Sequence, residues 1–216
     1  MAEVRWSCTA GIATVVISNP AKLNAMSPEM WRELGTALDA AEADAAVRII
    51  VLTGDGDKAF VSGADISRLA PKASGGAPPT EEDMPYMIPM RCQKPVIAKI
   101  RGYCFGGGLG LAAACDLRFC SDDAQFRMPA ARLGLGYSYV GVRRFMTILG
   151  ATNTMDLFMS ARRFGADEAL RMGFVMRVAA PEQLDAEVDW WTSMVAENAP
   201  LTMKAAKLTV NTLLAD

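Results

Sequence analysis

The first 43 residues of the chain change from a period-two to a helical hydrophobic pattern. Apolar and polar residues alternate over 4–8, a turn follows at 9–11, and 12–17 is rich in β-branched residues, which predicts two paired strands. From Ser27 onward, apolar residues recur at helical spacing. Ser27 is a good helix cap and Pro28 suits the first helical position, so a helix is expected to begin there.

The middle of the chain combines buried strands with glycine-rich connections. Short apolar runs at 48–53, 95–100 and 117–120 are bounded by glycine or charged turns, which is typical of strands buried in a mixed α/β sheet. The segment 69–80 is dense in Pro, Gly and Ala and predicts an exposed, mobile loop. That loop either borders a pocket or serves as a plain linker.

After Val140 the hydrophobic spacing becomes mainly helical. The predicted elements are helices at 142–149, 152–159 and 167–172, a strand at 175–178, and helices at 181–197 and 200–214. Trp190, Trp191, Leu208 and Leu213 need burial. They pack either on the α/β core or in a subunit interface, and the pattern leaves both open.

Composition predicts one globular domain that handles a small molecule. The 216 residues are 51% hydrophobic, enough to bury a core. The 22 basic and 24 acidic residues nearly cancel and form no long run, so we expect neither nucleic acid nor a membrane surface as partner. No apolar stretch reaches the roughly 18 residues of a membrane span, and no signal peptide is evident, so a cytoplasmic location is expected.

Cysteine and histidine usage narrows the chemistry. The five cysteines have no C-x-x-C spacing and lie mostly among apolar residues, which predicts buried, reduced thiols. The chain has no histidine. This excludes Ser-His-Asp and Cys-His nucleophilic sites, histidine acid/base catalysis and the usual zinc sites.

Two glycine-containing loops are candidate binding sites. In the first, at 60–66, small residues lead from a strand into a helical turn that Asp65 is expected to cap. Small side chains let a ligand approach the backbone, and N–H groups at a helix start are unpaired. The alternative is an ordinary glycine turn.

The second loop, at 101–110, carries three consecutive glycines between a buried strand and an apolar helix. Such a run costs backbone entropy, so it indicates close approach to a ligand or tight packing of the helix on a strand. Gly108-x-Gly110-x-x-Ala113 formally matches a dinucleotide fingerprint. The match is weak because the acidic residue expected about 20 positions later is missing.

Four segments together carry a resemblance to a known family. They are NPAKLNAMSPEM (19–30), FVSGADI (60–66), KPVIAKIRGYCFGGGLGLAAACDLR (94–118) and AQFRMPAARLGLG (124–136). In order and spacing they closely resemble the crotonase (enoyl-CoA hydratase/isomerase) superfamily. The resemblance implies an α/β spiral of ββα units over 1–180, a helical C-terminal region at 181–216 that is shorter than in relatives, and homotrimers or dimers of trimers.

The resemblance also implies a site. The substrate would be an acyl-CoA, with CoA as part of the substrate and no separate cofactor or metal. The N–H groups of Ala64 and Gly107 would form an oxyanion hole that stabilises an enolate. The substrate- and CoA-binding positions would be Lys22, Leu23, Ala25, Ser62, Gly63, Asp65, Ile66, Gly106, Gly108, Gly110, Ala130, Arg132 and Ser138. Lys22 either meets a CoA phosphate or is simply solvated.

The chain departs from the hydratase pattern at both catalytic glutamates, whose positions hold Gly110 and Ala130. Hydration and isomerisation therefore lose their usual bases. The stretch YSYVGV, beginning at Tyr137, resembles the Tyr-x-x-Val-Gly segment of methylmalonyl-CoA decarboxylases, although those relatives have His where this chain has Ala64. Decarboxylation needs no base, and Tyr137 could orient a carboxylate or pass a proton. The sequence thus predicts a hydratase/isomerase-type enzyme, with a decarboxylase-type lyase and a non-catalytic CoA-binding relative as alternatives.

Overall fold

The computed structural model describes residues 2–64 and 84–215. Its main sheet has six strands in the order β1-β2-β3-β5-β7-β10. These strands are β1 (Glu3–Thr9), β2 (Ile12–Ser18), β3 (Ile49–Gly54), β5 (Val96–Ile100), β7 (Leu117–Ser121) and β10 (Arg177–Ala179). The two strands predicted to pair are β1 and β2, which run antiparallel, and the remaining neighbours are parallel. The predicted loop at 69–80 lies outside the described residues.

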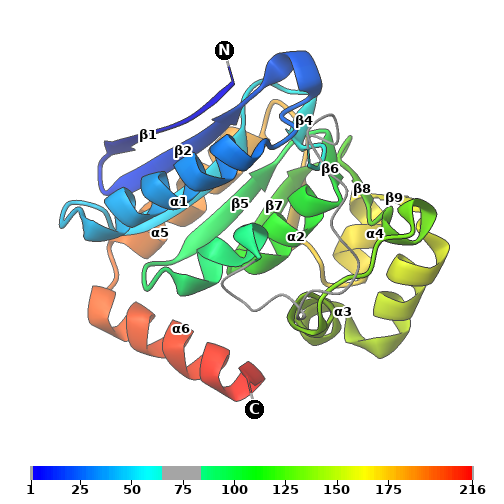
Figure 1. Ribbon diagram of the computed structural model, residues 1–216. Coiled ribbons are helices and arrows are strands. Elements are labelled where there is room, and N and C mark those ends of the chain that lie inside the picture. The colour runs from blue at the N-terminus through cyan, green and yellow to red at the C-terminus, as the bar shows by residue number, and fades with distance from the viewer. Residues whose placement is uncertain (1, 65–83, 216) are drawn as a thin grey trace.

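A second, smaller sheet runs beside the first in the order β4-β6-β8-β9. Its strands are β4 (Ala59–Val61), β6 (Tyr103–Phe105), β8 (Gln125–Arg127) and β9 (Arg163–Gly165). The chain alternates between the sheets, because β3, β5 and β7 of the main sheet are each followed by a short strand of the second one. Repetition of this step produces the predicted spiral (Figure 1).

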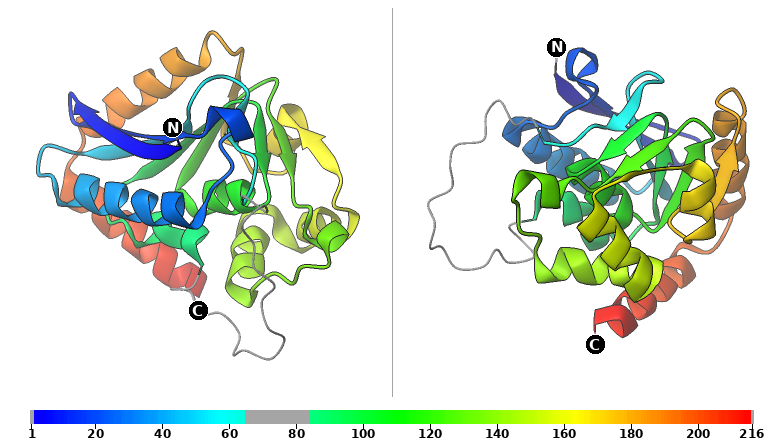
Figure 2. Two further views of the ribbon diagram at one scale, coloured as in Figure 1. Left: turned by 45° about the horizontal axis from the view of Figure 1, so that its top comes forward. Right: turned by 90° about the vertical axis from the view of Figure 1, so that its right-hand side faces the viewer.

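Helices cover both faces of the main sheet. They are α1 (Pro28–Ala43), α2 (Gly107–Ala114), α3 (Tyr139–Ser160), α4 (Ala166–Arg171), α5 (Leu184–Ala196) and α6 (Pro200–Ala215), with short 3-10 helices η1 (Pro20–Lys22), η4 (Pro85–Arg91) and η5 (Ala130–Leu133). Along β3, Ile50 and Leu52 join the cluster that includes α1 and α2, whereas Ile49 and Val51 join the cluster under α5. The sheet is therefore buried on both faces, with α1 and α5 on opposite sides (Figure 2).

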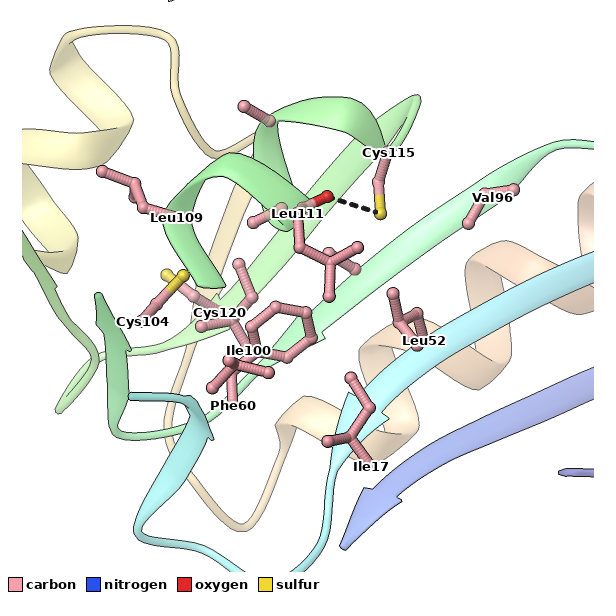
Figure 3. Packing of buried hydrophobic residues seen from close by; sticks show 14 of the residues in the cluster. Ile17, Leu52, Phe60, Val96, Ile100, Cys104, Leu109, Leu111, Cys115 and Cys120 are labelled. Atoms are coloured by element: carbon pink, nitrogen blue, oxygen red, sulfur yellow. Dashed lines mark hydrogen bonds between the residues drawn. The ribbon is translucent and has the colours of Figure 1, made fainter. Parts of the chain in front are cut away.

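The larger cluster forms the platform on which α2 rests. Leu109 and Leu111 of α2 pack with Phe60 and Ile100, and all four side chains are fully buried (Figure 3). Because α2 is hydrophobic on every side, it is enclosed rather than half-exposed. The first residue of this enclosed helix is Gly107, so the core fixes the position of the glycine loop.

Three sequence predictions needed correction in the C-terminal half. The helices expected at 142–149 and 152–159 belong to α3, which is broken only where Gly150 adopts φ 73° and ψ 168°. The strand expected at 175–178 is wrong at its start, because the Val175 N–H bonds back to Ala169 O in the turn after α4. The helix expected from 181 begins at Leu184, because Gln183 N–H closes a turn on Ala180 O.

The sequence did not decide where four large apolar side chains are buried, and the structure places them partly in the core and partly on the surface. Trp191 packs against Phe119, with ring centroids 5.8 Å apart. Trp190, Leu208 and Leu213 are 56%, 64% and 70% exposed in the single chain. The core therefore accounts for only one of the four.

The five cysteines are free thiols, and all except Cys8 are buried. Burial raises the pKa of Cys115 and of Cys120 to about 12, and that of Cys92 to about 11. At pH 8 we therefore expect Ellman's reagent to modify Cys8 alone in the native protein and all five thiols after unfolding. Fast native reaction of two or more thiols would contradict this burial.

The same thiols set the sign of an alkaline pH dependence. Because their folded pKa values lie above the unfolded value, the stability that they contribute is complete below about pH 8.5 and is lost as pH rises toward 11 to 12.

None of the helices among the described residues has the length and apolarity that a bilayer crossing requires.

Candidate functional site

The segment that follows β2 is folded into a rigid loop by two asparagines. Asn24 Oδ1 accepts from Asn19 N–H at 2.9 Å, and Asn24 Nδ2 donates to Asp55 O at 3.0 Å and Ala59 O at 2.7 Å. Leu23 and Asn24 both have positive φ, at 51° and 56°. The buried Asn24 side chain thus provides hydrogen bonds to three backbone groups, which maintain this conformation.

This loop aligns with the residues that leave β4. Ser62 N–H donates to Leu23 O at 3.2 Å, Ser62 Oγ donates to Lys22 O at 3.1 Å, and Met26 N–H donates to Gly63 O at 2.9 Å. The predicted binding positions Lys22, Leu23 and Ala25 therefore lie beside Ser62 and Gly63. Asp65 and Ile66 lie outside the described residues.

The glycine triplet at 106–108 lies on the other side of the segment that contains Gly63 and Ala64. Gly106 N–H donates to Arg127 O at 2.9 Å, and Gly106 has φ 53°, which turns the chain into α2. A Cβ built on Gly107 would lie 3.9 Å from Ala64 N and 3.4 Å from the ring of Trp31. The folded chain thus brings Ala64 and Gly107 together, although they are far apart in sequence.

Both backbone N–H groups lack an acceptor within the described part of the chain. No hydrogen bond is made by the Gly107 N–H, and no side chain caps α2. Met26 pairs with Ala64 in a parallel bridge, but its N–H bonds to Gly63 O, so the bridge leaves the Ala64 N–H unused. Two adjacent free donors at the positive end of a helix are suited to an oxygen that carries negative charge.

Three of the predicted positions, Gly107, Gly108 and Gly110, lie on α2, and the reason why each is a glycine differs. Any side chain on Gly108 would run into Val61, whose Cβ lies 2.7 Å from the position of an added Cβ. Tight packing of the helix on a strand, the alternative left open by the sequence, therefore explains Gly108. An added Cβ on Gly107 would not collide in this way, because its nearest neighbour would be the edge of the Trp31 ring.

At Gly110, where hydratases of the family place a glutamate, the space is already filled. An added Cβ would lie 2.6 Å from Tyr137 Oη and 2.9 Å from the ring of Tyr86. Tyr137 Oη is buried and has no hydrogen-bond partner among the described residues. Burial raises the pKa of Tyr137 well above its ordinary value, and the adjacent Tyr86 adds to the shift. Tyr137 is therefore a neutral phenol at physiological pH.

The remaining predicted positions differ in accessibility. Ala130 is buried at the start of η5, and Arg132 on the same short helix is exposed. Ser138 Oγ accepts from Gly141 N–H at 3.1 Å and caps α3. Their roles in binding stay predictions, and for Ser138 the helix cap already explains the side chain.

Sequence reasoning missed Trp31, Asn24 and Tyr86 as parts of this region. Asn24 lies inside the motif at 19–30. Its position soon after an apolar strand is the sequence signal that could have identified it. Trp31 was hidden in the apolar face of α1. Tyr86 had no signal, because only folding brings η4 onto α2.

A cavity lies beside this region. It has a volume of about 620 Å³ and its walls include Leu23, Lys58, Arg101 and Tyr103. Of the predicted binding positions within the described ranges, only Leu23 lines this cavity. Within the described ranges, no three His, Cys, Asp or Glu side chains are grouped so as to hold a metal ion.

Comparison with known proteins agrees with this fold. The sequence profile described as enoyl-CoA hydratase/isomerase matches residues 7–216. A short-chain-enoyl-CoA hydratase of Clostridium acetobutylicum is 32% identical over 202 residues, which are 93% of this chain and 77% of the relative. A peroxisomal Delta(3,5)-Delta(2,4)-dienoyl-CoA isomerase of Arabidopsis thaliana is 32% identical over 219 residues, covering 94% of this chain and 78% of that protein.

Solved structures show the same architecture. An enoyl-CoA hydratase/carnithine racemase from Magnetospirillum magneticum superimposes with a TM-score of 0.89 at 29% identity, covering 97% of this chain and 80% of the other. The spiral of two sheets with C-terminal helices is thus a crotonase fold. The chain belongs to the enoyl-CoA hydratase/isomerase family of the crotonase superfamily.

Proposed function

We propose that the protein binds an acyl-CoA thioester and holds its carbonyl oxygen between the N–H groups of Ala64 and Gly107. The observation that carries the proposal is the proximity of these residues, since a Cβ on Gly107 would lie 3.9 Å from Ala64 N and both donors are unused within the described residues. Negative charge develops on the thioester oxygen as an enolate forms. Fixed donors aimed at that oxygen stabilise the enolate most strongly.

By family membership the reaction is of the hydratase/isomerase type. Neither Gly110 nor Ala130 supplies the carboxylate that removes a proton in such reactions. Hydration or isomerisation at this site therefore requires a base from another position.

Decarboxylation is the second candidate, and the position of Tyr137 favours it. Loss of CO₂ from a 2-carboxyacyl-CoA leaves the electron pair on C2 and so produces the enolate directly. The enolate carbon then takes up a proton. The Tyr137 hydroxyl, which occupies the space beside Gly110, is placed to orient the departing carboxylate or to relay that proton.

Mass spectrometry of three thioesters tests these assignments. The protein is incubated with crotonyl-CoA, a 3-enoyl-CoA and methylmalonyl-CoA, and we expect at least one to be converted. Added water identifies a hydratase, a product of unchanged mass with a shifted double bond an isomerase, and lost CO₂ a decarboxylase. Calorimetric binding without any conversion would favour a non-catalytic relative, and absence of binding would contradict the proposal.

The cytoplasmic location and the homotrimer or dimer of trimers also stay proposals. Exposed apolar side chains such as Leu208 and Leu213 support self-association. Sedimentation analysis of the purified protein tests the assembly, and a monomer at micromolar concentration would contradict it.

A further inference from the structure

A second cavity lies between the two C-terminal helices and the body of the protein. It has a volume of about 500 Å³, and α3, α5, α6 and the start of β7 contribute to its wall. In Figure 1, α6 lies at the lower edge of the molecule, below the sheet. The cavity is within the range of about 300–1,000 Å³ that is usual for small-molecule sites. Most of its wall is apolar, formed by Ile148, Trp191, Val195, Met203, Val210 and Leu214.

Two guanidinium groups interrupt this apolar wall. They belong to Arg118 on β7 and Arg144 on α3. Arg118 Nη1 and Arg144 Nη2 donate to the same acceptor, Cys115 O, at 2.8 Å and 3.1 Å. The Arg118 residue is only 7% exposed. Two positive charges are thus held side by side in a largely apolar setting.

Neither charge has an acidic partner in the described part of the chain. Every hydrogen bond that the two guanidinium groups make there is accepted by a backbone carbonyl. Asp116, the acidic residue on the cavity wall, already accepts from Lys207 Nζ and from Val96 N–H, both at 2.7 Å. Burial lowers the pKa of Arg118 to about 10 and also lowers that of Arg144. Buried charges are normally paired, because an unpaired one is costly.

The C-terminal end of α2 offsets only part of this charge. A helix C-terminus is equivalent to about half a unit of negative charge, whereas the two guanidinium groups carry two positive charges. More than one positive charge therefore stays uncompensated. This excess makes the cavity complementary to an anion.

Both guanidinium groups also have donors to spare. Arg118 Nη2 and Arg144 Nη1 have no acceptor among the described residues. Neither nitrogen is sealed in the core, because the only fully buried unpaired side-chain nitrogen within those residues is Arg48 Nε. Since both arginines line the cavity, their free N–H groups are available to a ligand inside it.

We propose that this cavity binds a fatty carboxylate, an amphiphile with one carboxylate head and one unbranched hydrocarbon chain. The carboxylate oxygens accept from Arg118 Nη2 and Arg144 Nη1, because planar guanidinium donors match the geometry of a carboxylate. The hydrocarbon chain lies along the apolar wall and displaces water from it.

This site is distinct from the oxyanion hole. Gly107 begins α2, whereas the arginines bind the carbonyls at its other end, roughly 10 Å away along the helix axis. The proposal therefore does not depend on the proposed acyl-CoA function.

Decanoate and decanol test the charge complementarity, because they share one chain length and differ in the anionic head. Calorimetry with the purified full chain, in the absence of thioester, measures both Kd values. We expect saturable binding of decanoate and at least about tenfold weaker binding of decanol, because hydrogen bonds from charged donors to a carboxylate are strong. Equal affinities would overturn the proposal.

A cavity-filling substitution locates the ligand. Ala206 lines the cavity from α6, so the indole of Ala206→Trp should occupy its volume and raise the Kd of decanoate at least about tenfold. Ala205→Trp is the matched control, since Ala205 is the preceding residue of the same helix, is exposed and does not line the cavity. Its Kd should stay within about twofold of the wild-type value. Circular dichroism checks that both variants are folded.

Arg144→Met tests the carboxylate contact itself. The variant should lose most of the preference for decanoate over decanol, while its decanol affinity stays within about twofold. If this variant fails to fold, because Arg144 also binds the carbonyls of α2, the contrast between Ala206→Trp and Ala205→Trp still decides the location.

Three further results would overturn the proposal. The first is the absence of saturable decanoate binding, as expected if a second copy of the chain fills the cavity. The second is an unchanged decanoate Kd in folded Ala206→Trp. The third is displacement of decanoate by crotonyl-CoA, which would place the carboxylate in the acyl-CoA site. Decanoate binding in a protein that binds no thioester would support this inference and contradict only the proposed function.

Discussion

Gly107→Pro should lower kcat by about a hundredfold to a thousandfold while the protein stays folded. Gly107 is the first residue of α2, the position at which proline is best tolerated, because its N–H has no partner inside the helix. The substitution therefore deletes the proposed donor with little cost to the helix. Turnover is measured on whichever thioester the mass spectrometry identifies, with circular dichroism as the check of folding.

Gly107→Ala is the matched control for this variant. It adds a Cβ at the same place, 3.4 Å from the Trp31 ring and 3.9 Å from Ala64 N, and it retains the N–H group. The alanine variant thus controls for the added Cβ, and the proline variant differs from it by the loss of the N–H and by the ring that closes on the nitrogen. Equal turnover by the two variants would show that the Gly107 N–H does not stabilise the reacting oxygen.

The elements predicted correctly are those with a strong repeating pattern. The paired strands β1 and β2, the capped helix α1 and the buried strands β3, β5 and β7 all have at least five residues with a clear period or a continuous apolar run. Three of the four strands of the second sheet, β6, β8 and β9, were missed, because each has only three residues. Such strands are specified by their partners across the sheet, which local sequence does not reveal.

The glycines show a similar limit on predicting the site. From sequence, the triplet indicated only that side chains are excluded, with a ligand and tight packing both possible as reasons. The structure separates the two, because Gly108 meets Val61 whereas Gly107 borders Ala64. Gly110 has a third reason, namely the two tyrosine rings, one of which comes from η4.

The other end of α2 is held by two arginines, the buried Arg118 and the partly buried Arg144. Arg118 Nη1 donates to Cys115 O at 2.8 Å and Ala112 O at 3.3 Å, and Arg118 Nε donates to Phe174 O. Arg144 donates to Ala113 O at 2.6 Å and to Cys115 O at 3.1 Å. Cations are favourable at a helix C-terminus. Burial and the neighbouring Arg144 lower the pKa of Arg118 to about 10, so it remains charged at neutral pH.

Arg118→Met should lower the free energy of unfolding by about 2–4 kcal/mol, because hydrogen bonds from a charged group are worth about 1.5–3 kcal/mol and the Phe174 carbonyl loses its charged donor. Urea denaturation measures the change, with Arg132→Met, at an exposed arginine, as the control expected within about 0.5 kcal/mol. A loss below about 0.5 kcal/mol would mean that water replaces the arginine at these carbonyls. Since α2 runs from Gly107 to these arginines, a large loss would show that they stabilise the helix whose first residue carries the proposed donor.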